Sequence, residues 1–242
     1  MDSTNDAPFG QFAAAIEAEL RVETDEARRE KATSYVPSTL EVLGVPAPAL
    51  RVVVRRYTSQ LADAPPEDVV ALAIELVNRR THEGRQTGWE IVGRRRDAMA
   101  LLDRDLLERL GRGNDNWASV DGFAVTLSGV VWRQGGITDQ DIADWAASRD
   151  RWWRRTALVS TVPLNKKSRG GTGDVPRTLA VCERLAKDRE PMVAKALSWA
   201  LRDIVPRDRH AVERFLDRHG EVLPALVKRE VRNKLETGRK SG

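Results

Sequence analysis

Apolar residues recur every three or four positions along most of the chain, as on the buried face of an amphipathic helix. Two clear examples are VVALAIELVNRR (69–80) and WEIVGRRRDAMALLDRDLLERLGRG (89–113), whose apolar positions share one face at 3.6 residues per turn. No segment shows the convincing apolar–polar alternation of a half-buried strand. The pattern therefore predicts an all-α fold.

Proline, glycine and capping residues divide this pattern into separate helices. Thr138 and Asp141 have the spacing of a capping box, and Asp115 and Asp150 are each expected to cap the helix that follows. The breaks lie at Pro46 and Pro48, Pro65 and Pro66, 111–113, Gly135 and Gly136, the loop at 166–174, and Pro206.

A weak internal repeat suggests how these helices are arranged. AASRDRWWRRTAL (146–158) and LAKDREPMVAKAL (185–197) align at a spacing of about 39 residues, which is typical of two-helix repeats of the HEAT type. Such repeats stack into an α-solenoid with a concave face for a long partner. The alternative is a helical bundle without repeats.

Composition limits the class of partner and the chemistry. Lys and Arg outnumber Asp and Glu by only 40 to 36 in the 242 residues, so a nucleic-acid role requires basic residues gathered on one face. Seven of the aromatic residues are Trp, against two Tyr and four Phe, which favours surfaces that use flat rings. Cys182 is the single cysteine, which excludes an internal disulfide framework and a multi-cysteine zinc site.

The familiar signatures of hydrolases, metalloenzymes and nucleotide-binding proteins are missing. The sequence has no HExxH, GxSxG or Walker motif, and its three histidines are widely separated. We therefore expect neither a metal nor another cofactor. The N-terminus does not resemble a signal peptide, and no apolar run is long enough to cross a bilayer. A cytoplasmic protein and no membrane partner are expected.

Two Trp-x-x-Arg pairs are candidates for contact with an anion. Trp152 precedes Arg155 by three residues, and Trp199 precedes Arg202 by three, so ring and guanidinium share a helix face. An indole offers a flat plate to a sugar or base, and a guanidinium matches a phosphate. Each pair could equally be a core tryptophan beside a solvated arginine.

An acid stands apart from these basic pairs. Asp121 follows Trp117 by one helical turn, at the flank of a predicted apolar stripe of Val120, Ala124, Leu127 and Val131. Gly122 would let another backbone come close. Asp121 could face a groove, or it could simply interact with the helix dipole. The residues alone leave both interpretations open.

The sequence resembles the DNA alkylation repair family of bacterial AlkD-like glycosylases, which are HEAT-like solenoids. The resemblance covers about 35–235 and implies a repeat domain at 35–237, an N-terminal segment and helix (1–34) packed on it, and a disordered tail (238–242). The segments that carry it are VLGVPAP (42–48), NWASVDGFA (116–124), WAASRDRWWRRTAL (145–158), EPMVAKALSWALRDI (190–204) and KREV (228–231).

The resemblance implies a monofunctional glycosylase that hydrolyses the N-glycosidic bond of cationic purines, such as 3-methyladenine and 7-methylguanine, in double-stranded DNA. Asp121, Trp117 and Trp199 match the catalytic cleft of the family. Among the residues grouped with DNA binding, Arg155, Arg202 and Lys195 match family residues that hold the backbone, while Trp152 matches a tryptophan whose main role is expected to be structural. A monomer is expected, associated with the nucleoid when it is bound to DNA.

Two segments depart from the family pattern. YVPSTLEVLGV (35–45) lacks the polar and aromatic residues usual there and carries Glu41, and LNKKSRGGTGDVP (164–176) is longer and more basic than the usual connection. The basic loop could be a mobile surface loop or supply an extra phosphate contact. The alternative to a glycosylase is a non-catalytic HEAT-repeat scaffold that binds nucleic acid or protein.

Overall fold

The computed structural model describes residues 8–240, and helices account for all the regular structure among them. Glu41 and Thr81 form one isolated bridge in this part of the chain, without a strand. The predicted all-α fold class is therefore confirmed. Residues 1–7 of the predicted N-terminal segment and 241–242 of the predicted tail lie outside the described residues. No described helix is long and apolar enough to cross a membrane.

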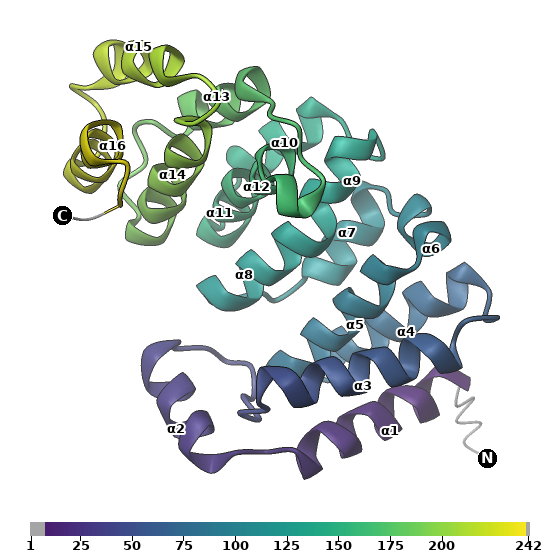
Figure 1. The fold of residues 1–242 in the computed structure, drawn as a ribbon. Helices are drawn as coiled ribbons and strands as arrows, with labels where there is room; N and C mark the ends of the chain where they lie inside the picture. The colour runs from purple at the N-terminus through teal and green to yellow at the C-terminus, as the bar shows by residue number, and fades with distance from the viewer. Residues whose placement is uncertain (1–7, 241–242) are drawn as a thin grey trace. The chain divides into compact units, whose positions relative to one another are not determined.

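The chain divides into two compact units, with the boundary between Leu127 and Ser128. In the N-terminal unit, α1 packs against α3, α4 and α5, and α8 packs against α5 (Figure 1). The core of this unit is built from helix faces that are apolar at helical spacing, as predicted. Its helices are α1 (Pro8–Val22), α2 (Glu26–Tyr35), α3 (Ala47–Gln60), α4 (Pro66–Asn78), α5 (His82–Arg94), α6 (Arg96–Ala100), α7 (Arg104–Gly111) and α8 (Trp117–Phe123).

The C-terminal unit stacks helical pairs in the manner that the internal repeat predicts. The pair α10 and α11 is followed by the pair α13 and α14, and α10 packs on α13 while α11 packs on α14. Its helices are α9 (Gly129–Gln134), α10 (Asp139–Ala146), α11 (Arg151–Val159), α12 (Val162–Asn165), α13 (Val175–Arg184), α14 (Pro191–Ile204), α15 (Arg209–His219) and α16 (Ala225–Thr237) (Figure 1). A short 3₁₀ turn, Lys167–Arg169, lies in the basic loop.

Two of the predicted helix starts are confirmed. The Thr138 side chain accepts from the backbone of Asp141, whose carboxylate accepts from the Thr138 backbone, so the capping box at α10 is complete. Asp150 caps α11 by accepting from the backbone N–H of Trp152 at 2.8 Å. These caps satisfy amide groups that the first turn of a helix leaves unpaired.

The prediction that Asp115 caps the next helix is wrong. Asn116 caps α8 instead, and the Asp115 carboxylate accepts hydrogen bonds from the Ser38 hydroxyl and the Thr39 backbone. Burial alone would raise the pKa of Asp115, but these hydrogen bonds to its ionised form outweigh that effect and lower it. Asp115 therefore fixes the segment after α2 to the start of α8.

A buried acid shapes the turn that leads into α3. The Glu83 carboxylate, 5% exposed, accepts from the backbone N–H groups of Leu43 at 2.9 Å, Gly44 at 2.8 Å and Val45 at 3.3 Å. Gly44 has φ +78°, and a Cβ there would lie 2.6 Å from the backbone nitrogen of Arg29. The backbone conformation of the VLGVP segment thus depends on the Glu83 carboxylate and on Gly44.

Cys182 gives a simple test of how tightly the C-terminal unit is packed. Its side chain is fully buried in α13, and burial raises the pKa of the thiol. Because the thiolate is the reactive form, we expect a thiol reagent to modify the native protein far more slowly than the urea-unfolded protein. Comparable rates in the two states, followed by absorbance, would contradict the packing around Cys182.

Candidate nucleic-acid interface

Trp117 begins α8 and forms part of an aromatic pair. Its half-buried ring meets the ring of Tyr35 edge to face, with centroids 5.8 Å apart and planes at 82°. Tyr35 ends α2 and is 74% exposed, and α2 has no buried residue. The family resemblance begins at about Tyr35, but Tyr35 was not among the predicted site residues. An exposed aromatic ring at the end of a polar helix is the signal that could have identified it.

Asp121 lies one turn after Trp117 on α8 and is half-buried. Val120 and Leu127 are fully buried, so the predicted apolar stripe and the position of Asp121 at its flank are confirmed. The helix is shorter than its periodicity suggested, because residues Ala124–Ser128 form a π-helical turn. Single π turns inside helices are rare and are frequent at functional sites.

Gly122 does not have the role expected from the sequence. Within the N-terminal unit, a Cβ at Gly122 would meet only the ring of Trp89, at 3.7 Å, which is ordinary van der Waals contact. The predicted close approach of a second backbone is therefore not found there. Trp89 is itself fixed, since its indole N–H donates to the carbonyl of Leu110 at 3.1 Å.

A buried cation supports the segment that leads into α8. Arg85 is 2% exposed and donates to the carbonyl of Arg112 at 2.7 Å and to the side-chain oxygen of Asn114 at 3.1 Å. Burial lowers the pKa of Arg85 to about 10, helped by Arg80 and opposed by Asp115. Sequence reasoning missed this residue, because its partners lie 27 and 29 positions away.

Trp152 and Arg155 lie on α11 in the C-terminal unit. Trp152 is half-buried, and the guanidinium of Arg151 lies over its ring at 4.8 Å. Arg155 is only 5% exposed and donates to the carbonyl of Met192 in α14. Arg155 therefore links α11 to α14, in addition to any role towards a ligand.

Trp199 and Arg202 lie on α14. The ammonium of Lys166 lies 5.9 Å from the centroid of the half-buried Trp199 ring. Arg202 donates from Nε to the hydroxyl of Ser198 at 3.2 Å, and its Nη2 lies 3.6 Å from Oε2 of Glu230. Both Trp-x-x-Arg pairs are thus on helices, as predicted, with their arginines oriented by protein groups.

The predicted site residues fall into two sets, one in each unit. Trp117 and Asp121 share α8. The set in the C-terminal unit lies on two helices that pack against each other. Trp152 and Arg155 lie on α11, and the half-buried Trp199 and Arg202 lie on α14 together with Lys195, which is exposed.

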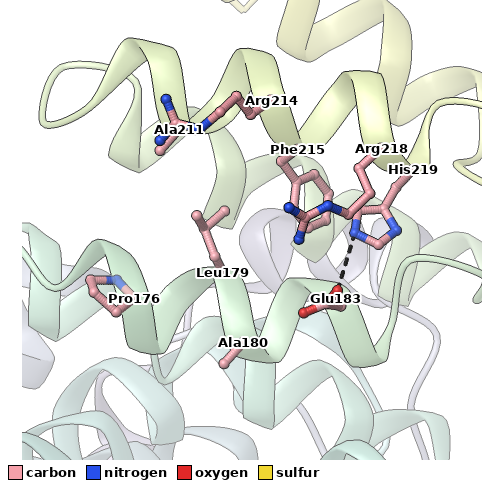
Figure 2. Close-up of a pocket in the computed structure, with 9 residues that line it drawn as sticks. All are labelled: Pro176, Leu179, Ala180, Glu183, Ala211, Arg214, Phe215, Arg218 and His219. Atoms are coloured by element: carbon pink, nitrogen blue, oxygen red, sulfur yellow. Dashed lines mark ion pairs between the residues drawn. The ribbon is translucent and has the colours of Figure 1, made fainter.

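A pocket between α13 and α15 contains none of these residues. It has a volume of about 240 Å³ and is lined by Leu179, Arg214 and Phe215, among others, with an ion pair of 3.4 Å between Glu183 and His219 at one end (Figure 2). The candidate interface is therefore separate from this pocket.

The comparison with known proteins agrees with the resemblance seen in the motifs. Residues 16–235 match the model of a family described as DNA alkylation repair enzyme, a range that contains every predicted site residue. No curated protein matches the sequence.

Proposed function

Because the chain belongs to the DNA alkylation repair enzyme family, we propose that it is a monofunctional DNA glycosylase for cationic alkylpurines in duplex DNA. The observation that carries the proposal is the carboxylate of Asp121, held on α8 one turn after Trp117 and within the matched residues. Its substrates are purines alkylated at N3 or N7, such as 3-methyladenine and 7-methylguanine.

The chemistry explains why a protein that binds DNA through basic residues would also use an acid. Alkylation at N3 or N7 gives the purine a positive charge, so the base leaves with the electron pair of the N-glycosidic bond and becomes neutral. The sugar that remains has oxocarbenium character, as in other glycoside cleavages. Asp121 stabilises this cation and orients the water that attacks C1′. The water oxygen bonds to C1′, its extra proton is released, and the products are a free base and an abasic site.

The other predicted residues bind the DNA in this proposal. Trp117 and Trp199 each offer an aromatic ring to a deoxyribose, and Arg155 and Arg202 bind phosphates of the backbone. A guanidinium has five N–H donors. Arg202 donates from Nε to Ser198 and places Nη2 3.6 Å from Glu230, so it keeps further donors for a phosphate. Lys195 is exposed on α14 and contacts the backbone, while Trp152 supports α11.

The proposal is tested by the product formed on methylated duplex DNA in the presence of EDTA. Purified protein should create abasic sites, detected with an aldehyde-reactive probe, without nicking the strand. Undamaged duplex, incubated in parallel, should remain free of them. Binding of the methylated duplex without abasic sites would instead favour the rival function of a non-catalytic helical scaffold.

Arg202→Ala is expected to weaken DNA binding without unfolding the protein. The side chains of Arg202 and Glu230 are only 15% and 14% exposed. Glu230 keeps the Ser198 hydroxyl and Lys240 as partners after the substitution, so we expect the variant to stay folded. Loss of one phosphate contact should reduce the slope of log K against log salt by about one. Fluorescence anisotropy with a duplex at several salt concentrations measures this slope. An unchanged slope in a folded Arg202→Ala variant would show that Arg202 does not contact a DNA phosphate.

A further inference from the structure

A second pocket lies beside Trp199, and its lining is dominated by positive charge. Its volume is about 370 Å³, and four cations face a single carboxylate across it. The cations are Lys166, Arg202, Arg207 and Lys234, and the carboxylate is Asp203. These residues come from the start of the basic loop, from the end of α14 and the residues just after it, and from α16, so folding brings together charges far apart in sequence.

Two of these cations lack an acidic partner. Within residues 8–240, neither Arg207 nor Lys234 has a carboxylate at ion-pair distance, whereas Lys166 lies 3.7 Å from Asp203. Arg207 donates one hydrogen bond, to the carbonyl of Asn165 at 2.8 Å, and Lys234 donates to the carbonyl of Gly238 at 2.5 Å. Carbonyls orient these groups without neutralising them, so the pocket retains a positive charge that an anion can balance.

The pocket is held in shape by the residue at the base of the loop. Asn165 is 4% exposed and donates to the carbonyl of Thr161 at 2.9 Å and to the hydroxyl of Thr178 at 2.8 Å. Its side-chain oxygen accepts from the backbone N–H of Asp174 at 2.9 Å, which closes the loop. At Gly173, with φ +102°, a Cβ would lie 3.2 Å from Cδ of Arg207. The loop therefore packs against Arg207 and helps to hold its side chain in the pocket.

The single acid in the pocket, Asp203, is paired with Lys166 at 3.7 Å. Burial raises the pKa of Asp203, against the opposing effect of Lys166, and Lys166 also partly compensates its charge. Lys166 lies over the ring of Trp199 as well, so the pocket and the aromatic ring are neighbours in the same unit. An anion bound in the pocket would be adjacent to whatever the ring of Trp199 holds.

We propose that the pocket lined by Lys166, Arg207 and Lys234 binds a phosphodiester group of the DNA backbone next to the nucleotide that Trp199 contacts. This inference rests on the proposed function, and it gives the long basic loop the role of an additional phosphate site. Phosphate oxygens match the ammonium groups and the free donors of the Arg207 guanidinium. A DNA backbone supplies such groups in series, and the polar lining offers no aromatic slot for the base of a free nucleotide.

The experiment measures binding of an undamaged duplex by fluorescence anisotropy across a range of KCl concentrations. Lys234→Gln should reduce the slope of log K against log salt by about one. Arg232→Gln is the matched control, because it removes one exposed charge from the same helix outside the pocket, and its slope should equal that of the wild type. Arg207→Lys keeps the positive charge and should retain the slope, whereas Arg207→Gln should lose about one.

A folded Lys234→Gln variant with the slope of the wild type would overturn the inference. Inorganic phosphate is the probe for the alternative ligand, a free phosphate ion in place of a phosphodiester of DNA. If it raised the Tm of the wild type at constant ionic strength, and Lys234→Gln abolished that shift without changing the DNA slope, the pocket would bind free phosphate and not DNA. Excision by the wild type is measured separately. If the variants change the slope but the wild type does not excise, the phosphate site stands and the glycosylase is rejected. If the wild type excises but the variants leave the slope unchanged, the glycosylase stands and the phosphate site is rejected.

Discussion

Replacing Asp121 by Asn is expected to slow single-turnover excision of 7-methylguanine about 100- to 1000-fold. A group that faces developing charge in a transition state typically contributes an effect of this size. Asn has nearly the same shape but no charge, so it cannot stabilise the oxocarbenium-like sugar. Affinity for duplex DNA should be retained, because removing a carboxylate from a polyanion-binding surface introduces no repulsion.

The control for Asp121→Asn is the same change at Asp63. Asp63 is exposed in the N-terminal unit. Replacing it by Asn changes the net charge by the same amount, and this variant should excise at the wild-type rate. Both variants are compared by single-turnover kinetics with enzyme in excess, after circular dichroism has shown that they are folded. Excision by Asp121→Asn at the wild-type rate would reject the proposed mechanism even if the activity itself were real.

Glu83→Ala is expected to destabilise the protein by about 3–5 kcal/mol. The substitution leaves the backbone N–H groups of Leu43, Gly44 and Val45 without their acceptor in a buried site, and each unsatisfied buried donor costs about 1–3 kcal/mol. It also removes a negative charge from the first turn of α5, where the helix dipole favours an acid. Glu83→Gln should cost less, because its amide oxygen can still accept from part of the turn.

Urea unfolding monitored by circular dichroism measures both Glu83 variants. Glu90→Ala is the matched control on the same helix. Within residues 8–240, the interactions of Glu90 are an i,i+4 ion pair of 3.8 Å with Arg94 and a hydrogen bond with Gln86. Its loss should cost less than about 1 kcal/mol. Equal midpoints for Glu83→Ala and Glu90→Ala would show that the three hydrogen bonds do not stabilise the fold.

The fold was largely predictable because helices are encoded locally. Periodicity identified the helical segments, the capping box at Thr138 is present as predicted, and the repeat of about 39 residues matches the pairs α10–α11 and α13–α14. The error at Asp115 has a physical reason. Asp115 and Asn116 are both good capping residues, and a contact with Ser38, 77 positions away, decided between them. The π turn at Ala124–Ser128 likewise interrupts a helix whose apolar pattern continues.

The candidate site was predictable only in part. Trp117, Asp121 and the two Trp-x-x-Arg pairs could be proposed because their spacing within one helix is visible in the sequence, and their roles in the site stay predictions. Tyr35, Arg85 and Glu83 were not, since each acts on a partner from another segment. The same holds for Lys166, whose place in a basic loop was evident but whose position over Trp199 depends on tertiary packing.

The measurement that tests the central claim most directly is mass-spectrometric identification of the bases released from methylated duplex DNA. Wild-type protein and Asp121→Asn are incubated side by side, without metal or cofactor. We predict that the wild type releases 3-methyladenine or 7-methylguanine and that the variant releases little of either. Absence of release by a folded wild type that still binds the duplex would contradict the glycosylase and favour a non-catalytic DNA-binding protein.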